Sequence, residues 1–170
     1  MQRPNSRQLI LLRHAQAASQ LSVEDRERPL TEKGQRQANQ MAGVLAQYAL
    51  CEFEVYVSPS KRTLQTAQII CQYHAIPSQQ IKVVAELYDA SVETLLSVLQ
   101  STPDTIRKLW VIGHNPSLTE VLFRLMGPQQ ATAAPLDLKP ASVAVLTISG
   151  SWQALQHVPI TLDSLIDADG

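Results

Sequence analysis

Short apolar runs alternate with amphipathic segments along most of the chain. The runs at residues 8–12, 53–57, 81–85 and 109–112 have the length and composition of buried β-strands. In the segments between them, apolar residues recur every three or four positions, which is the spacing of a helix that buries one face. This alternation predicts a mostly parallel sheet with helices on both faces, that is, a three-layer α/β/α sandwich.

Residues that favour helix starts precede the helical segments. Thr31 and Ser91 are suited to accept a backbone N–H at an N-cap. Ser58-Pro59 and Asn115-Pro116 each offer a cap followed by a proline at the first helical position. The core-facing positions expected on the four helices are Ala38, Met41, Ala42, Leu45 and Ala49; Leu64, Ala67, Ile70 and Cys71; Leu95, Leu96 and Leu99; and Leu118, Val121, Leu122 and Leu125.

The C-terminal part of the chain is predicted to complete the sheet. Residues 143–148 and 152–158, joined by a short Ser-Gly-Ser turn, have the pattern of a β-hairpin, so we expect a mixed sheet of about six strands. Residues 127–140, rich in alanine and proline, are expected to form the longest loop. The end of the chain is expected to fray, and it carries Asp163, Asp167 and Asp169.

Composition narrows the class of protein. With 170 residues, 45% of them hydrophobic and 17% charged, the chain is expected to form one globular domain over residues 1–170. A formal net charge of −1 provides no overall basic field that would favour nucleic acid or an anionic membrane. No stretch has membrane-spanning length, and the apolar run at residues 9–12 is too short for a signal-peptide core. Cys51 and Cys71 form no Cys-x-x-Cys pair and are expected to be free thiols in the reducing cytoplasm.

Three of the predicted strands end in groups that suit an anion. The first ends in Arg13-His14, the second leads into residues 58–62 with Arg62, and the fourth ends in Gly113-His114. Because the carboxyl ends of parallel strands meet at one edge of a sheet, these side chains are expected to converge beside two helix N-termini. Arginine forks and helix N–H groups both bind phosphate oxygens. Taken singly, each group is more often a structural feature of a sheet edge, a helix start or a solvated helix turn than part of a site, so only their joint placement indicates a site.

Four sequence blocks, in the same order, resemble those of the histidine phosphatase superfamily, which has the phosphoglycerate mutase-like fold. They are Leu-Ile-Leu-Leu-Arg-His-Ala at residues 9–15, Arg-Pro-Leu-Thr-Glu-Lys-Gly at 28–34, Ser-Pro-Ser-Lys-Arg-Thr-Leu-Gln-Thr-Ala at 58–67, and Val-Ile-Gly-His-Asn-Pro at 111–116. The short connections between the blocks resemble the small bacterial phosphohistidine phosphatases of this superfamily in particular.

The resemblance implies a role for each matching residue. His14 would be the nucleophile that becomes phosphorylated, while Arg13, Arg62 and His114 would surround the phosphoryl oxygens. A histidine nucleophile must be neutral, with one ring nitrogen aimed at phosphorus. The charge that develops on the oxygens requires donors already in place, and these residues supply them. We expect no metal and no other cofactor, since the chain contains no Gly-x-x-x-x-Gly-Lys loop and no local metal-ligand spacing.

The proton donor to the leaving group is less well defined. Leu87-Tyr88-Asp89 resembles the leucine, any residue, acid pattern of larger members, with Glu86 as a competing carboxylate. Asp89 could instead cap the helix expected near Ser91. The distinction matters because an alkoxide leaving group needs protonation far more than imidazole does, so a weak acid favours phosphoramidates over phosphate esters.

The short connections also predict an open site, which suits a phosphoryl group carried on another protein. The leading hypothesis is therefore a phosphatase for phosphohistidine on phosphorelay proteins. A phosphatase or mutase for a small phosphorylated metabolite, and a non-catalytic phosphoprotein-binding module, remain as alternatives. Five basic residues could form a rim that steers an acidic partner or could simply be solvated: Arg26, Arg28, Lys33, Arg36 and Lys61.

Overall fold

The computed structural model describes residues 6–19, 23–48, 53–131 and 136–168. Three of the expectations above fall outside these ranges. They concern the core position Ala49, the thiol of Cys51 and the terminal Asp169.

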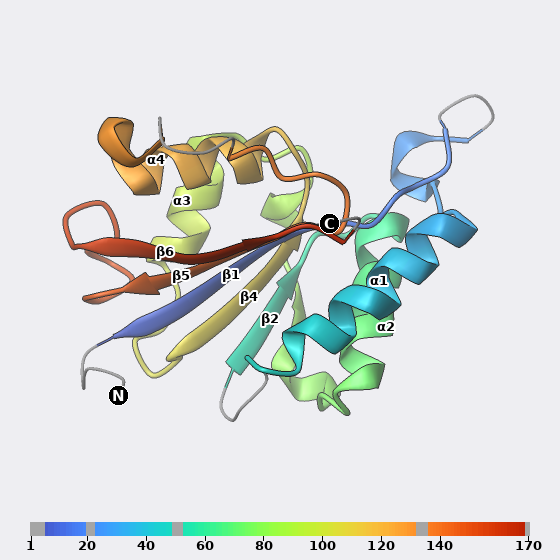
Figure 1. The fold of residues 1–170 in the computed structure, drawn as a ribbon, viewed down its shortest axis with the longest axis horizontal. Coiled ribbons are helices and arrows are strands. Elements are labelled where there is room, and N and C mark those ends of the chain that lie inside the picture. Colours follow the sequence, from blue (N-terminus) through green and yellow to red (C-terminus); the bar gives the residue numbers. More distant parts are fainter. Residues whose placement is uncertain (1–5, 20–22, 49–52, 132–135, 169–170) are drawn as a thin grey trace.

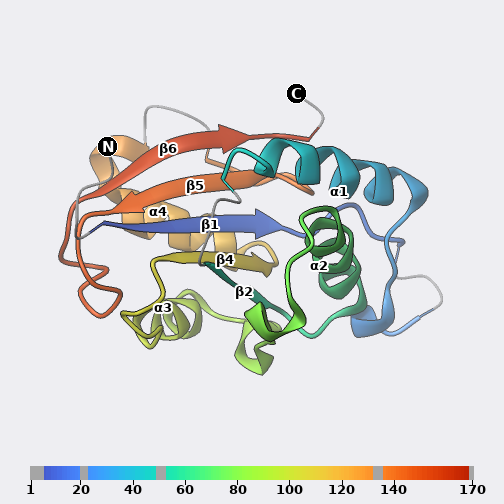
Figure 2. The same ribbon diagram turned by 90° about the horizontal axis from the view of Figure 1, so that it is seen from below.

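A six-stranded mixed sheet forms the centre of the protein, with the strand order β3-β2-β4-β1-β5-β6. The strands are β1 (Arg7–Arg13), β2 (Phe53–Val57), β3 (Ile81–Val83), β4 (Lys108–Gly113), β5 (Val143–Ile148) and β6 (Ile160–Ile166). The first four strands are mutually parallel, whereas β5 runs antiparallel to β1 and β6 runs antiparallel to β5. Figure 2 shows the arrows of β1 and β4 pointing one way and that of β5 the other. The expected architecture is confirmed.

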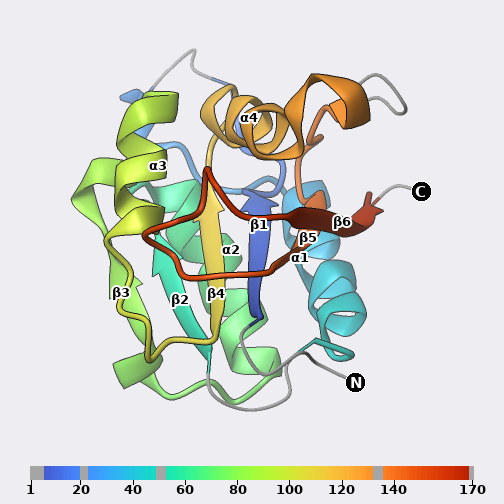
Figure 3. The same ribbon diagram turned by 90° about the vertical axis from the view of Figure 1, so that its left-hand side faces the viewer.

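Helices cover both faces of this sheet (Figures 1 and 3). Helices α1 (Glu32–Leu45) and α2 (Lys61–Tyr73) pack side by side on one face, and α3 (Val92–Gln100) and α4 (Ser117–Ala131) cover the other. Short 3₁₀ turns precede α1, β3 and α3; they are η1 (Asp25–Glu27), η2 (Ser78–Gln80) and η3 (Ala85–Leu87).

The central strand β1 is buried on both faces because its side chains alternate between two cores. Leu9 and Leu11 join the core under α3 and α4, whereas Ile10 and Leu12 join the core under α1 and α2. All four residues are at most 1% exposed. This two-sided burial explains why the strand is a continuous apolar run rather than an alternating one.

Two of the expected helix caps are present. The hydroxyl of Thr31 accepts the Gly34 N–H at 3.0 Å at the start of α1. The hydroxyl of Ser91 accepts the Thr94 N–H at 3.1 Å at the start of α3. These bonds satisfy N–H groups that the first turn of a helix leaves without intrahelical partners.

The expected start of α2 was wrong by two residues. Its N-cap is Ser60, which forms a reciprocal capping box with Thr63, and Pro59 lies outside the helix. Ser58 cannot serve as the cap because its hydroxyl is engaged by His114 instead. At α4, the helix likewise begins after the Asn115-Pro116 pair, at Ser117.

The second strand of the expected hairpin was also misplaced. Residues 152–157 form turns, and the strand that pairs with β5 is Ile160–Ile166. The side chains of Trp152 and Leu155, three positions apart, both point inward, which is a turn spacing rather than strand alternation. The indole N–H of Trp152 donates to the carbonyl of Ile106 at 2.7 Å and so anchors this turn to the core.

Two other expectations for the C-terminal part need correction. The expected loop at residues 127–140 begins as helix, because α4 continues past a break at Gly127, where φ is 72°, to Ala131. Asp163 and Asp167 are held rather than frayed. Asp163 lies in β6 and accepts the Thr147 hydroxyl at 2.6 Å, while Asp167 accepts the hydroxyl of Ser142 and the ammonium of Lys139.

Cys71 is a buried free thiol in α2, as expected. Burial raises the pKa of this thiol to about 11, so it is an unreactive core residue. Within the described ranges, no helix is long and apolar enough to cross a membrane.

Candidate active site

The carboxyl ends of β1, β2 and β4 bring the sequence-predicted residues together. The parallel ladders continue one residue beyond the strands: the His14 N–H donates to the Gly113 carbonyl and the Ser58 N–H donates to the Ile112 carbonyl, both at 3.1 Å. His14, Ser58 and the start of the loop that carries His114 are therefore held by backbone bonds. The expected convergence at this edge is confirmed, since the same cavity is lined by Arg13, His14, Arg62 and His114.

The imidazole of His14 has a defined tautomer. Its Nδ1 lies 2.8 Å from the carbonyl oxygen of Ala15. Because a carbonyl can only accept, Nδ1 carries the ring proton and Nε2 is left with a free lone pair. The ring is 5.3 Å from that of His114, at an interplanar angle of 60°.

The surroundings of His14 keep the ring neutral. Burial lowers its pKa, and the charges of Arg62, Arg13 and Arg28 lower it further, to about 4, although the bond to the Ala15 carbonyl acts in the opposite direction. At neutral pH the Nε2 lone pair is thus available, which a nucleophilic histidine requires.

His114 is fixed through both ring nitrogens. Its Nε2 lies 2.8 Å from the hydroxyl of the buried Ser58, and its Nδ1 lies 3.3 Å from Nη2 of Arg62. A guanidinium only donates, so Nδ1 accepts from Arg62 and Nε2–H donates to Ser58. Burial and the nearby charge of Arg62 lower the pKa of His114 to about 3.

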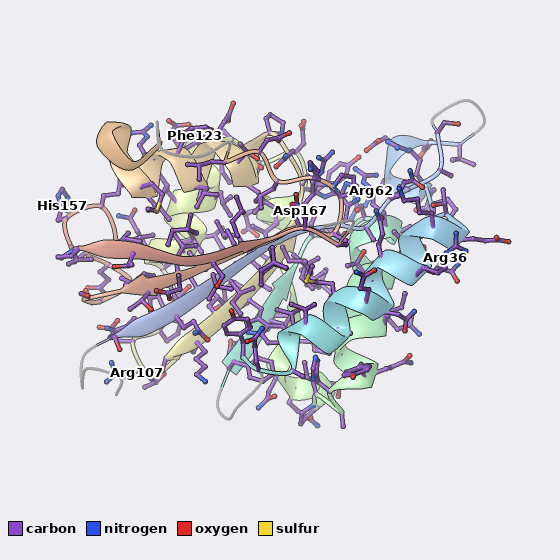
Figure 4. The ribbon with its side chains drawn as sticks, in the orientation of Figure 1. Arg36, Arg62, Arg107, Phe123, His157 and Asp167 are labelled. Atoms are coloured by element: carbon purple, nitrogen blue, oxygen red, sulfur yellow. The ribbon has the colours of Figure 1, made fainter. Side chains whose placement is uncertain are left out.

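The two predicted arginines occupy different environments. Arg62, in the first turn of α2, is only 6% exposed and donates to Asp25 through both terminal nitrogens. Arg13 is the last residue of β1 and donates to the carbonyl of Leu138 at 2.8 Å. Desolvation lowers the pKa of Arg13, partly offset by the charge of Asp137. Figure 4 shows Arg62 at the carboxyl end of the sheet.

The site contains further residues that sequence reasoning missed or assigned elsewhere. Asp25 and Tyr88 line the cavity and were not predicted as site residues; Arg28 also lines it and was predicted only as part of the rim. The Asp25 carboxylate accepts from Arg28 at 2.9 Å, from Arg62 at 2.9 Å and from the Tyr88 hydroxyl at 3.1 Å. The spacing of Asp25 and Arg28, three residues apart before the Pro-Leu-Thr block, was the one signal available in the sequence.

A close backbone approach holds the Arg28 segment beside the loop that follows His14. Arg28 Nε donates to the carbonyl of Ala18 at 2.7 Å, and the Thr31 N–H donates to the Gln16 carbonyl at 3.0 Å. A Cβ at Gly34 would lie 2.0 Å from that same Gln16 oxygen, so only glycine fits there. The glycine of the Arg-Pro-Leu-Thr-Glu-Lys-Gly block therefore serves packing rather than chemistry.

The cavity has a volume of about 500 Å³ and a mainly polar lining. It is lined by Arg13, His14, Asp25, Arg28, Arg62, Tyr88, Asp89, Ala90, His114, Asn115, Pro116 and Ser117. Of the two candidate proton donors, Asp89 belongs to this lining, whereas Glu86 lies by a separate surface hollow against α3. Asp89 does not cap α3, because Ser91 does. The Asp89 side chain is exposed at the edge of the cavity.

The predicted basic rim is only partly associated with the cavity. Arg26 donates to the Pro59 carbonyl at 2.8 Å and its guanidinium lies 5.4 Å from the centre of the Tyr88 ring. Lys33, Arg36 and Lys61 are exposed and do not line the cavity, and Figure 4 shows Arg36 pointing away from the protein. Within the described ranges, no three His, Cys, Asp or Glu side chains cluster as a metal site would require.

Fold and site together define an α/β protein with a histidine and arginine cavity at the carboxyl edge of its sheet, an arrangement suited to a phosphoryl group. Residues 9–110 match the family model of the histidine phosphatase superfamily (branch 1). The chain therefore belongs to the histidine phosphatase superfamily.

Similarities to individual proteins are consistent with membership of this superfamily. An uncharacterised protein of Mycobacterium tuberculosis is 30% identical over 146 residues, which cover 83% of this chain and 89% of that protein. A candidate phosphohistidine phosphatase SixA from Nakamurella multipartitia is 27% identical, with a TM-score of 0.79 and coverage of 95% of this chain and 96% of its own. Its counterpart from Agrobacterium tumefaciens is 25% identical, with a TM-score of 0.79 and coverage of 94% and 97%. These similarities support a phosphatase.

Proposed function

We propose that this protein is a metal-independent phosphohistidine phosphatase that acts through a phosphorylated His14. The observation that carries the proposal is the neutral imidazole of His14, whose Nδ1–H is tied to the Ala15 carbonyl and whose Nε2 has a free lone pair, in a cavity lined by arginines. The similarity to candidate SixA phosphatases supports the same class of substrate.

The proposed reaction has two displacements. The lone pair of His14 Nε2 attacks phosphorus, and the P–N bond to the substrate histidine breaks with its electron pair going to the substrate imidazole, which takes up a proton. Water then attacks phosphorus on His14 and gives up a proton to solvent, while the P–Nε2 bond breaks with its electron pair returning to Nε2. Inorganic phosphate leaves and the neutral imidazole is restored. Arg13 and Arg62 would stabilise the charge on the equatorial oxygens throughout, and His114 would join them by exchanging its Nε2–H bond to Ser58 for one to a phosphoryl oxygen. Arg28, which also lines the cavity, adds a further cation.

The weak placement of the proton donor favours a phosphoramidate substrate over a phosphate ester. We propose Asp89 for this role, because it is the carboxylate of the cavity lining that is not engaged by the arginines. Its exposed position leaves it a weakly placed acid, and an imidazole leaving group depends little on such help. A small phosphorylated metabolite is the second candidate substrate, since the cavity of about 500 Å³ could hold one.

We further propose that residues 1–170 act as one catalytic domain in the cytoplasm and that the substrate is a phosphorelay protein phosphorylated on histidine. The two cores share the strands of one sheet, which supports a single unit. The buried free thiol of Cys71 is compatible with a reducing compartment.

Rates measured side by side on a histidine-phosphorylated phosphotransfer domain and on a panel of phosphate monoesters test the proposal. We expect phosphohistidine to be hydrolysed faster by at least about tenfold, and Asp89→Asn to slow the esters more than the phosphoramidate. Glu86→Gln, a carboxylate outside the cavity, is the matched control and should leave both rates unchanged. Faster turnover of one of the monoesters would reject the phosphohistidine assignment, and equal losses on both substrates would remove Asp89 as the proton donor.

A further inference from the structure

One carboxylate, that of Asp25, connects three separate elements around the cavity. Its Oδ1 accepts from Arg28 Nη1 at 2.9 Å, and its Oδ2 accepts from Arg62 Nη2 at 2.9 Å and from the Tyr88 hydroxyl at 3.1 Å. Asp25 itself belongs to η1, Arg62 to α2, and Tyr88 to the turn that follows η3. Each oxygen of the carboxylate therefore holds one guanidinium.

The Asp25 carboxylate offsets the repulsion between two arginines of the cavity. Arg28 and Arg62 both line the cavity, and two guanidinium groups side by side repel each other. The side chain of Arg62 is only 8% exposed, so its charge is costly without a partner. The carboxylate between the two arginines offsets this repulsion and fixes where their remaining N–H groups point.

Asp25 cannot serve as the proton donor of the reaction. Partial burial alone would raise the pKa of its carboxyl, but the hydrogen bonds from Arg28, Arg62 and Tyr88 outweigh this and lower the pKa to about 2. The group is therefore ionised at neutral pH and acts as a fixed negative charge. Any effect of Asp25 on the reaction must therefore act through the side chains that its carboxylate binds.

We propose that Asp25 is a positioning residue of the phosphoryl site, which holds Arg62 and Arg28 in the orientation that receives the phosphoryl oxygens. The inference rests on the proposed function, because it assigns the arginines to the phosphoryl group. Catalysis by donors that are already in place loses much of its effect when those donors have to reorganise. Removal of a residue that orients such a group costs about 10- to 100-fold in comparable metal sites, and we expect a loss of this size here.

The substitution Asp25→Asn isolates the carboxylate from the rest of the segment. Arg62 Nη1 also donates to the backbone carbonyl of Asp25 at 2.5 Å, and this bond does not depend on the side chain. Asparagine offers a single acceptor oxygen, and its amide N–H₂ would face a guanidinium that can only donate. The variant should fold, since the Asp25 side chain is 34% exposed, but it cannot hold both arginines.

A double-mutant cycle with Arg62→Ala tests the proposal, with the dissociation constant for tungstate, a tetrahedral oxyanion, measured by calorimetry beside kcat and KM. Asp25→Asn should weaken tungstate binding several-fold and should lower kcat/KM about 10- to 100-fold, mostly through kcat. In the Arg62→Ala background most of this loss should disappear, because the two residues act as a unit. A merely structural role would give the same loss with and without Arg62.

Glu27→Gln is the matched control, since Glu27 is an exposed carboxylate of the same 3₁₀ turn and does not line the cavity. Equal tungstate binding and turnover in Asp25→Asn and Glu27→Gln would overturn the proposal, as would full additivity with Arg62→Ala. Tungstate binding does not require turnover, so a protein that binds tungstate in an Asp25-dependent manner but leaves phosphohistidine intact would contradict the proposed substrate and support the role of Asp25. Failure of the unaltered protein to bind tungstate would overturn the phosphoryl site and this inference with it.

Discussion

At the scale of single residues, the protonation state of His14 determines what the site can do. The ordinary pKa of histidine is near 6.5, so an unperturbed ring would be partly protonated in mildly acidic solution and could not attack phosphorus. Burial and the three surrounding arginines lower the pKa of His14 to about 4. In the proposed mechanism, the same positive field that would hold the phosphoryl group therefore also keeps the His14 ring neutral and able to attack.

The pH dependence of turnover follows from this shift. The proposed mechanism requires His14 to be unprotonated, so kcat/KM of the free enzyme should stay level as the pH falls through 6 and 5 and should decline only as it approaches about 4. The Asp25 carboxyl, with a pKa of about 2, remains ionised over this range and should not contribute to the decline. An acidic limb near pH 6.5 would show that the nucleophile has an ordinary histidine pKa, contrary to this account.

At the scale of secondary-structure elements, the site depends on a loop that is pressed against its neighbour. The Arg28 segment and the start of α1 lie against residues 16–18, and Gly34 makes the closest approach, with no room for a Cβ beside the Gln16 carbonyl. This contact fixes the position of Arg28 relative to His14. Packing between two elements thus sets the geometry of a residue in the cavity.

The variant Gly34→Ala should accordingly destabilise the protein by about 1–3 kcal/mol, the usual cost of overpacking, in urea unfolding. Gly43→Ala in the same helix is the control, because the nearest atom to its added Cβ is the Tyr73 hydroxyl at 3.8 Å. That substitution should be neutral or should stabilise the protein by up to about 1 kcal/mol through helix propensity. If the two variants unfold at the same urea concentration, the close approach at Gly34 is not a constraint.

Sequence patterns predicted the elements whose signals are local and missed those that depend on distant partners. The apolar runs of β1, β2 and β4 and the caps Thr31 and Ser91 are present where expected. The segment at residues 152–157 has apolar residues like those of a strand, but it forms a turn. Its conformation depends on the hydrogen bond from Trp152 to the Ile106 carbonyl, which is distant in the sequence and cannot be seen in a local pattern. Asp25 was missed for the same reason, since its partner Arg62 lies 37 residues away.

At the scale of the whole molecule, the fold concentrates positive charge at one edge of a protein whose net charge is close to zero. The formal net charge is −1, yet the carboxyl edge of the sheet places Arg13, Arg28 and Arg62 around one cavity. Parallel strands achieve this because residues far apart in the sequence end at the same edge. The two cores under the helices hold that edge in place from both faces.

The central claim, that His14 carries the phosphoryl group, is tested most directly by trapping the intermediate. After millisecond mixing with a histidine-phosphorylated phosphotransfer domain and a quench in alkali, peptide mass spectrometry should locate a phosphate on His14 that survives base and is lost in acid. His14→Ala should give no labelled enzyme and no turnover, whereas His157→Ala, at the opposite end of the molecule (Figure 4), should behave like the unaltered protein. Phosphate on another residue, or turnover by His14→Ala, would contradict the account.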